Sequence, residues 1–471
     1  MQFAKEQLST DMLLLAFIYF MGTMAVVLVV VGLGFVDVAL VRRKNVLDTW
    51  IQKLTAALLA GAGTLLGGIA IWNWQFNQAF GVPNPLGQAI KDWWLGGTFM
   101  TTYAAQIPFD QLPEAEVQQV FVAFFMTFSL ATLALIHTGA MERMRPAPLY
   151  TMAVIIGLVL SPFVAYMCWG PAGLLSNRGT HDFEGIFPLY IFSGTWVLVL
   201  SWRLGPRLGA FKPHPSGAGP APSNIGLATA GVIIIMFALP FIALGSTWIF
   251  PGTGVFGISM TSTGIGIILV NILASYCGGA IAGIAIAYRL KQPVWALLGP
   301  LAGSVMCGTL FDVGMPWEVF LVSLLGPPVA LGTLALIRRW GIDEQKVIPL
   351  ALGPGVVGAL LVGFIEWGTK TGGFPGAEGD YALQHATITP WWQLAGIVAT
   401  MLVAAIPCLL ICLGFERRGK LRVSEEEELA GLDLTYWGVP NESEEVLTGV
   451  AVNGDGAADS SGSVPIGTST G

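Results

Sequence analysis

The sequence predicts an all-α integral membrane protein with eleven transmembrane helices. Of its 471 residues, 54% are hydrophobic and only 11% are charged, and the mean hydropathy is +0.70. Soluble domains carry about a quarter charged residues. Apolar stretches of about 20 residues, the length that crosses a bilayer as a helix, recur along the chain. Because lipid offers no hydrogen bonds to the backbone, each stretch is expected to be helical.

Eleven apolar segments define the expected spans. They are 12–41, 53–75, 117–137, 148–171, 184–203, 225–249, 256–289, 293–311, 316–338, 345–366 and 392–415. Glycine is frequent within them, and Gly279 and Gly283 form a small-xxx-small pair. Small residues let helices approach closely in lipid, so these glycines indicate ordinary packing within a helical bundle.

The basic residues predict the orientation of this bundle. With the N-terminus placed outside, eighteen of the twenty-two Lys and Arg residues fall in inside loops or in the tail. Only Lys5, Lys91, Arg178 and Lys370 fall outside. Basic residues are enriched in cytoplasmic loops, so the asymmetry favours an N-out, C-in arrangement. The polar start MQFAKEQLST lacks the pattern of a signal peptide, and we expect no cleaved leader.

The remaining composition argues against several other classes of protein. The net charge of −7 arises in residues 416–471, which hold eleven acidic and four basic residues, so we expect no nucleic-acid partner. We find no nucleophile–base constellation, phosphate loop or metal motif, and expect neither an enzyme nor a cofactor. Five cysteines lie in apolar stretches without CxxC spacing, which predicts buried single thiols. They are Cys168, Cys277, Cys307, Cys408 and Cys412.

Five segments carry a specific pattern in a fixed order. They are LVRRKNVLDTWIQKL (40–54), AFFMTFSLATLALIHTGAMER (123–143), YMCWGPAGLLSNRGTHDFEG (166–185), LGPRLGAFKPH (204–214) and LRVSEEEELAGLD (421–433). Each resembles a segment of the ammonium transporter (Amt/Mep/Rh) family, and together they span the chain. The resemblance implies two five-helix halves of inverted topology, an eleventh helix across them, and a homotrimer in the inner membrane with one pore per subunit.

The resemblance assigns an outer cation site to Trp169 and Ser246. An aromatic face attracts a nearby cation by about 0.5–2 kcal/mol. A tryptophan of the interfacial belt is the alternative reading of Trp169. Asp182 can accept backbone N–H groups where the fifth helix begins. The resemblance makes Asp182 a structural support of the pore, with direct contact to the cation as the alternative.

The family also places a pair of stacked phenylalanines at a gate below the outer site. The resemblance matches one of them to Phe128, whereas the other falls at Ile242, so half of the gate is aliphatic here. Phe124 lies one helical turn before Phe128 and matches a further aromatic position of the family. Packing in the protein core is an equally good reading of Phe124.

Two positions depart from the family where it carries its two pore histidines. Eight residues after Asp182 stands Tyr190, and nine residues after Asp343 stands Leu352. An imidazole both donates and accepts a hydrogen bond and titrates near neutral pH. The tyrosine hydroxyl titrates far above neutral pH, and leucine has no polar atom, so a two-member proton relay cannot pass here. The histidines of the chain lie elsewhere, at His137, His181, His214 and His385.

These substitutions bear on what the pore carries. An unpaired cation in an apolar passage costs several kcal/mol, so the sequence favours passage of ammonia released from ammonium, or of a close analogue. A pore adapted to another small solute is one alternative, and loss of conduction is a second. A non-conducting ammonium sensor or docking platform is the alternative from a different class of protein.

The sequence divides into a membrane domain (1–415), a cytoplasmic regulatory tail (416–445) and a C-terminus (446–471) expected to be disordered because of its Gly, Ser, Thr and Ala content. The resemblance implies that the tail packs on the cytoplasmic surface and responds to a trimeric PII signalling protein. A solvated acidic face is the alternative. The tail residues that carry the match are Arg422, Glu425, Glu426, Gly431 and Asp433.

Overall fold

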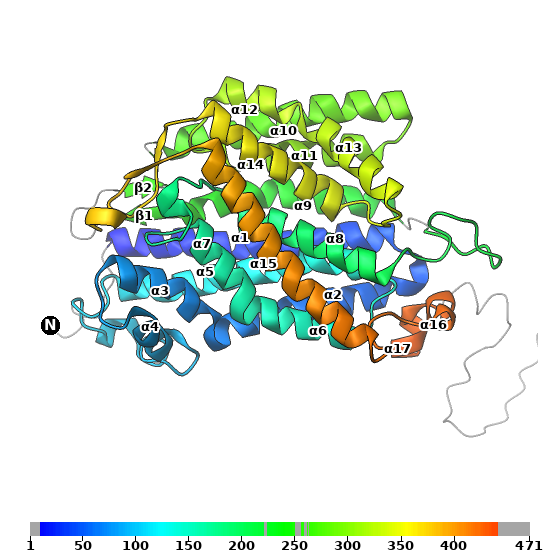
Figure 1. Cartoon of the computed structure of the whole chain (residues 1–471), viewed down its shortest axis with the longest axis horizontal. Coiled ribbons are helices and arrows are strands. Elements are labelled where there is room, and N and C mark those ends of the chain that lie inside the picture. Colours follow the sequence, from blue (N-terminus) through cyan, green and yellow to red (C-terminus); the bar gives the residue numbers. More distant parts are fainter. Residues whose placement is uncertain (1–9, 221–223, 250–255, 259–260, 262, 441–471) are drawn as a thin grey trace, which may run out of the picture.

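The computed structural model describes residues 10–220, 224–249, 256–258, 261 and 263–440. Its helices, labelled as in Figure 1, are α1 (Thr10–Leu40), α2 (Val46–Gly63), α3 (Ile69–Ala79), α4 (Pro85–Trp93), α5 (Ala115–Ala140), α6 (Pro146–Ile155), α7 (Ser161–Cys168), α8 (Phe192–Leu204), α9 (Ile225–Ala243), α10 (Ile265–Leu290), α11 (Val294–Cys307), α12 (Pro316–Ser323), α13 (Gly326–Arg339), α14 (Gly353–Ile365), α15 (Pro390–Glu416), α16 (Glu425–Ala430) and α17 (Leu432–Trp437). Two short antiparallel pairs are formed by β1 (Thr247–Ile249) with β2 (Phe256–Ile258), and by β3 (Lys370–Thr371) with β4 (Ala386–Thr387).

Ten helices of the described part are long and apolar enough to cross a membrane, which confirms the predicted all-α membrane class. They are Thr10–Leu40, Arg43–Ala79, Ala115–Ala140, Pro146–Cys168, Ile186–Leu204, Ile225–Ser246, Ile265–Leu290, Pro316–Arg339, Ile348–Ile365 and Pro390–Glu416. A shorter apolar helix, α11, occupies the position of the expected segment 293–311. Eleven crossings, the inverted repeat and the N-out, C-in orientation stay predictions.

One predicted boundary was wrong. The segment 256–289 was expected to be helical from its start, yet residues 256–258 form strand β2 and α10 begins only at Ile265. Hydropathy does not distinguish an apolar strand from an apolar helix end, which explains the error. The expected disordered stretch 446–471 lies outside the described residues.

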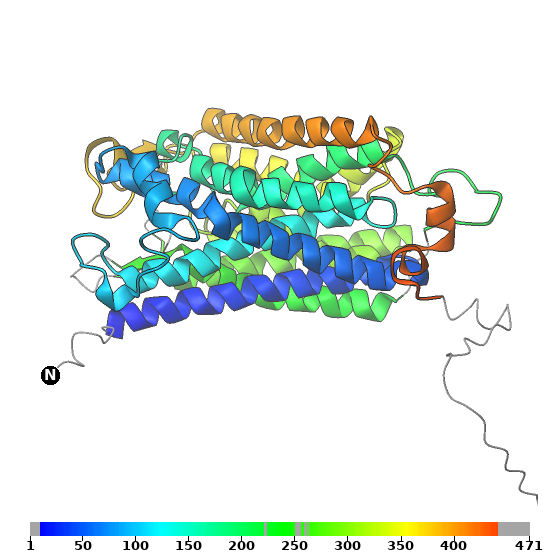
Figure 2. The same ribbon diagram turned by 90° about the horizontal axis from the view of Figure 1, so that it is seen from below.

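The long helices run side by side, and α15 crosses the outside of the bundle obliquely (Figure 1). It packs on α8 and α14, while α1 packs on α5 and α9. The two short helices α16 and α17 lie together at one end of the bundle, beside the start of α2 (Figure 2). We call this the tail end.

Two of the spans touch backbone to backbone through glycine. The second span continues from α2 to α3 through a π-helical turn, Thr64–Gly68, and the fourth from α6 to α7 through another, Ile156–Leu160. A Cβ added to Gly157 would lie 1.8 Å from the carbonyl oxygen of Ala60. Close approach of this kind requires a residue without a side chain.

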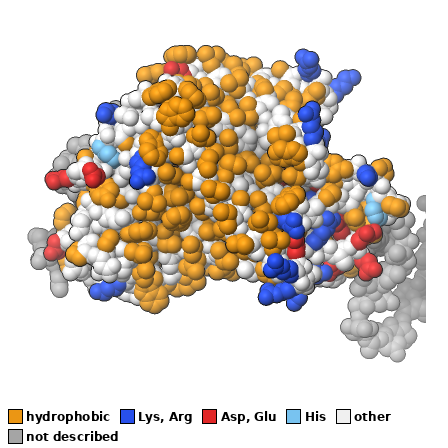
Figure 3. All heavy atoms as spheres, viewed as in Figure 1, with side chains coloured by type: hydrophobic (Ala, Val, Ile, Leu, Met, Phe, Trp, Pro, Cys, Tyr) orange, Lys and Arg blue, Asp and Glu red, His pale blue; other side chains and the backbone are white. Residues whose placement is uncertain are grey.

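Apolar side chains cover the middle of the visible face, and charged side chains gather toward its ends, most densely at the tail end (Figure 3). Large apolar residues such as Leu273, Ile281 and Leu402 are about half exposed on the surface of the chain, which suits contact with lipid or with another subunit. Cys277 is also exposed on α10, so the prediction of a buried thiol is wrong there. The apolar sequence of a membrane span does not show which face of the helix packs inside the bundle and which face points outward.

Candidate substrate path

Three cavities follow one another through the bundle. The entrance cavity, opposite the tail end, has a volume of about 180 Å³, the central cavity about 110 Å³, and the tail-side cavity about 160 Å³. Phe128, Glu184 and Ile242 line both the entrance and the central cavity. Thr138 and Lys346 line both the central and the tail-side cavity. Each space admits several water-sized molecules, so the three form a path interrupted at two narrow junctions.

The entrance cavity is lined mainly by aromatic rings. Trp169 follows the end of α7, and its ring lies 5.4 Å from that of Phe128 at 74° and 6.4 Å from that of Trp72 at 84°. Ser246 lines the same cavity from the end of the sixth span. The structure therefore brings the two predicted outer-site residues to one cavity, with exposed ring faces that suit a cation.

Asp182 holds the start of the fifth span. Its carboxylate accepts hydrogen bonds from the backbone N–H groups of Gly185 at 3.1 Å, Ile186 at 2.9 Å and Phe187 at 3.1 Å. These N–H groups have no partner within the helix itself. Gly185 has φ +88, a conformation that favours glycine and lets the chain turn onto the carboxylate. Both oxygens are thus engaged, as the expected support role requires.

The expected gate residues meet at the first junction. Phe128 and Ile242 are half-buried and border both cavities. Phe124 is buried, with its ring 5.0 Å from that of Phe128 at 88°, and also lines the entrance cavity. A Cβ on Gly245 would lie only 1.9 Å from Cζ of Phe124, so this ring is tightly packed as well as exposed to the path.

Tyr190 and Leu352 lie on two spans that pack against each other. Tyr190 is half-buried and lines the central cavity. Leu352 is buried against α8, where its Cβ would lie 2.6 Å from a Cβ on Gly194, and Leu350 and Ala351 line the cavity instead. Residues 348–352 form a π-helical turn. Its longer hydrogen-bond spacing changes which face each residue presents.

A buried charge cluster closes the far end of the central cavity. The carboxylate of Asp37 pairs with Lys53 at 2.6 Å and with Lys346, and it accepts a hydrogen bond from Thr138 at 2.8 Å. All four residues are buried or nearly so, and the cluster carries one net positive charge. Sequence reasoning missed it, although a charged residue inside a membrane span is itself a signal of function.

Glu184 is a second residue that was not predicted from the sequence. Its residue is only 6% exposed, and its side chain lines the path at the first junction. Neither carboxylate oxygen has a hydrogen-bond partner among the described residues. The signal was available, because HDFEG places a second acidic residue directly before an apolar helix.

The histidines do not replace the missing pair. None of them lines the central cavity. His181 borders the entrance cavity and is buried, with its ring nitrogens 2.8 Å from Asp312 and 3.0 Å from Thr371. No group of three side chains of the metal-ligating types is found within the described ranges.

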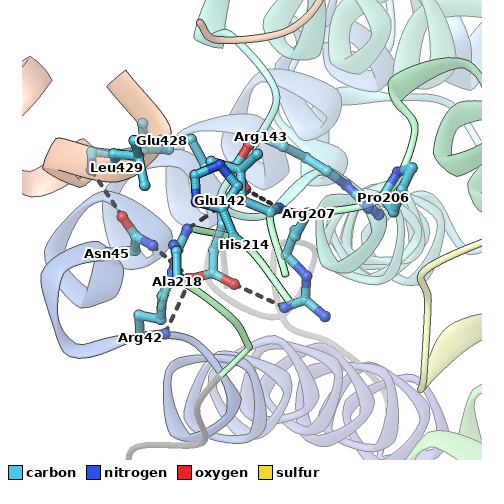
Figure 4. A network of polar contacts seen from close by, with 12 residues as sticks. Arg42, Asn45, Glu142, Arg143, Pro206, Arg207, His214, Ala218, Glu428 and Leu429 are labelled. Atoms are coloured by element: carbon cyan, nitrogen blue, oxygen red, sulfur yellow. Dashed lines mark hydrogen bonds and ion pairs between the residues drawn. The ribbon is translucent and has the colours of Figure 1, made fainter. Parts of the chain in front are cut away.

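Arg143, Arg207, Asp343 and Glu344 line the tail-side cavity. Figure 4 shows Arg143 and Arg207 within a network of polar contacts that includes Glu142. Arg207 pairs with Glu142 at 2.8 Å and, through Nε, with Asp343 at 2.8 Å, while Arg143 lies 3.4 Å from Asp343. Burial alone would raise the pKa of Asp343, but the hydrogen bonds and charge of Arg207, with help from Arg143, lower it to about 2. Arg207 and Arg42 likewise outweigh burial and lower the pKa of Glu142.

The tail is fixed to this end of the bundle. Arg422 donates to the carbonyl oxygens of Leu204 at 2.6 Å and Pro206 at 2.8 Å, and it pairs with Glu428 at 2.8 Å. Glu428 in turn accepts a hydrogen bond from the backbone of Leu208 at 2.8 Å. The tail therefore connects the end of α8 with helix α16.

A second attachment lies at the start of α2. Asp433 accepts hydrogen bonds from the backbone N–H groups of Leu47 at 3.1 Å and Asp48 at 2.8 Å. Gly431 has φ +98, and a Cβ there would lie 2.8 Å from Lys44. Acidic side chains suit a helix N-terminus, so Asp433 stabilises both the tail and α2.

The other two expected tail residues face outward. Glu425 and Glu426 are exposed, and Glu425 contacts the half-buried ring of His214 at 3.2 Å. The acidic start of α16 is thus presented on the surface of the tail end.

Fold and path together define a multi-pass membrane protein of a transport type. The model of the Ammonium Transporter Family matches residues 17–441, and the chain belongs to this family. It is 29% identical over 322 residues to Ammonium transporter Amt1 of Methanocaldococcus jannaschii, covering 68% of this chain and 76% of the relative. It is 26% identical over 421 residues to an ammonium transporter of Bacillus subtilis, covering 86% and 93%.

Two solved structures show the same fold. A structure named Sensor Amt Protein aligns with a TM-score of 0.72 at 18% identity, covering 91% of this chain and 99% of the other. The crystal structure of Candida albicans Mep2 aligns with a TM-score of 0.67 at 20% identity, covering 90% and 88%.

Proposed function

We propose that the protein takes up ammonium at the entrance cavity, that the ion loses its proton to water on the entrance side, and that ammonia is released at the tail end. One observation carries the proposal: three cavities meet end to end within one chain, at residues that line two of them at once. The relatives named as ammonium transporters support ammonium as the substrate. We place the protein in the inner membrane as a homotrimer with one path in each subunit.

The charges along the path favour passage of a neutral molecule beyond the first junction. The central cavity is mostly apolar, and an unpaired cation there costs several kcal/mol. At its far end a cation approaches Lys346, which lines the cavity, while the single carboxylate of Asp37 is shared between Lys346 and the buried Lys53. Like charges about 8 Å apart repel by about 2 kcal/mol at an effective dielectric constant of about 20. Uncharged ammonia avoids both the free-energy cost of a cation in the apolar cavity and the repulsion by the lysines.

Each predicted residue has a place in this scheme. Trp169 and Ser246 attract the cation in the entrance cavity, and Asp182 holds the backbone that surrounds it. Phe128 and Ile242 narrow the first junction, where the cation leaves its hydration shell. Phe124 fixes the position of Phe128, and the hydroxyl of Tyr190 offers the neutral molecule a hydrogen bond in the central cavity. Leu352 contributes packing against α8.

The test is an ammonium pulse on proteoliposomes that contain a pH dye, with current recorded on a solid-supported membrane. We expect internal alkalinisation faster than in protein-free liposomes, without a stoichiometric ammonium current. Ile242→Trp should fill the first junction and abolish the excess rate, and the matched variant Ile242→Val should retain it. A stoichiometric ammonium current would overturn neutral passage. A silent wild type that still binds ammonium would identify a non-conducting sensor.

We propose further that the tail surface is the docking site of a PII signalling protein. Support comes from the exposed acidic start of α16 beside an otherwise docked tail. Glu425→Lys combined with Glu426→Lys reverses this charge without touching the attachments at Arg422 and Asp433. Binding of purified PII protein to the membrane protein should be lost in this variant, and undiminished binding would contradict the assignment.

A further inference from the structure

Glu184 carries a buried carboxyl group where the entrance and central cavities meet. It follows Asp182 by two residues but takes no part in the hydrogen bonds that start the fifth span. Its own backbone N–H donates to the carbonyl oxygen of Gly308 at 3.2 Å, which fixes the backbone at this point. Both side-chain oxygens lack a partner among the described residues, and the group belongs to no ion pair there.

A buried carboxyl group without a hydrogen-bond partner is unfavourable unless a ligand binds to it. Leaving a buried polar atom unsatisfied costs about 1–3 kcal/mol, and more for a charged group. Two other carboxylates that lie near the path are satisfied, since Asp182 is bonded to backbone N–H groups and Asp37 to two lysines. Glu184 alone among these three is unpaired, and it faces cavities on both sides. Its missing partner is therefore expected to come from the path.

The surroundings keep the carboxyl group in place and leave room beside it. A Cβ on Gly308 would lie 2.5 Å from Cδ1 of Ile186 and 2.8 Å from Oε2 of Glu184, so a side chain at position 308 would crowd both side chains. Phe128 and Ile242 line the same junction with apolar surface. Together these residues leave one negatively charged or hydrogen-bonding group in an otherwise apolar constriction.

We propose that Glu184 binds the substrate cation at the first junction and that its ligand is an ammonium-type ion with N–H donors. The inference rests on the proposed function, because it takes the path to be one that carries ammonium. A partly dehydrated ammonium ion donates to both carboxylate oxygens and turns its remaining N–H groups toward aromatic faces. Magnesium and calcium take six or more oxygen ligands, and at this junction Phe128 and Ile242 supply none beside the carboxylate.

The binding test uses the purified trimer in detergent and titrates ammonium chloride by calorimetry, with N-methylglucamine chloride at equal ionic strength as background. Glu184→Gln keeps the size of the side chain and replaces the carboxyl group by an amide. We expect ammonium affinity to fall at least about tenfold in this variant. The matched variant Glu378→Gln, at an exposed residue of an outer loop, should bind as wild type. Equal affinity of wild type and Glu184→Gln, or no ammonium binding to wild type, would overturn the site.

A second variant tests whether the effect of Glu184→Gln arises only because the substitution disturbs the fold. Gly308→Ala retains the carboxyl group but should displace it, and should weaken ammonium binding while the trimer elutes normally on size exclusion. Undisturbed binding in Gly308→Ala would count against the assigned position of Oε2. The same proteins in proteoliposomes separate the two hypotheses. Ammonium binding that depends on Glu184 without transport would refute the proposed function alone, whereas transport unaffected by Glu184→Gln would refute the site alone.

Discussion

Replacing Asp343 with asparagine removes the carboxylate that Arg207 and Arg143 share at the wall of the tail-side cavity. The pKa of Asp343 is lowered from 3.8 to about 2, which corresponds to about 2 kcal/mol of stabilisation. Because the folded-state pKa lies below the unfolded one, this contribution is fully present above about pH 4 and is lost as the pH falls through about 2. The variant should therefore be less stable by a constant amount between pH 5 and pH 8.

Thermal unfolding of the purified protein, followed by tryptophan fluorescence at several pH values in that range, measures the effect. We expect Asp343→Asn to lower the midpoint by about 2–4 °C. Asp380→Asn makes the same chemical change at an exposed loop residue and should leave the midpoint unchanged. Equal midpoints for Asp343→Asn and wild type, or a difference that closes by pH 6, would refute the reasoning.

Three further changes probe the path and the tail. Gly245→Val overpacks Phe124 at a cost of about 1–3 kcal/mol and should slow ammonium-driven alkalinisation; an unchanged rate contradicts the described packing. Asp433→Ala removes a helix-capping carboxylate worth about 1 kcal/mol and should hasten tryptic cleavage of the tail, whereas equal cleavage times speak against this attachment. Lys346→Gln leaves Asp37 with one lysine and should lower the barrier to a cation by about 2 kcal/mol, raising ammonium current relative to alkalinisation; a constant ratio argues against the electrostatic barrier.

The helical membrane architecture followed from the sequence because burial in lipid leaves few alternatives. Hydropathy placed the spans near their observed positions, and it failed where an apolar segment adopts another conformation, as in β2 before Ile265. The eleventh candidate, α11, is shorter than a typical span and contains Pro300, which an apolar average does not reveal.

Only some residues of the candidate site could be predicted from the sequence. Resemblance pointed to Trp169, Ser246, Phe128 and Ile242, which do line the path. Counting along the chain also pointed to Leu352, which is buried against α8, while its neighbours Leu350 and Ala351 line the central cavity.

Other contacts exist only in three dimensions. Asp37 and Lys346 are 309 residues apart in sequence, and nothing local indicates that they pair. Glu184 showed a signal, an acidic residue at the edge of an apolar helix, but the sequence does not say whether such a group has a partner.

The contact of Gly157 with Ala60 restricts how this sequence can change over time. With 1.8 Å between a Cβ at position 157 and the facing carbonyl oxygen, even alanine requires the second and fourth spans to separate. Substitution at this point must be compensated on both spans at once, so random mutagenesis should leave position 157 among the least variable in the chain. The sequences of the second and fourth spans are therefore expected to change together during evolution. Exposed positions such as Leu402 remain free to exchange one apolar residue for another.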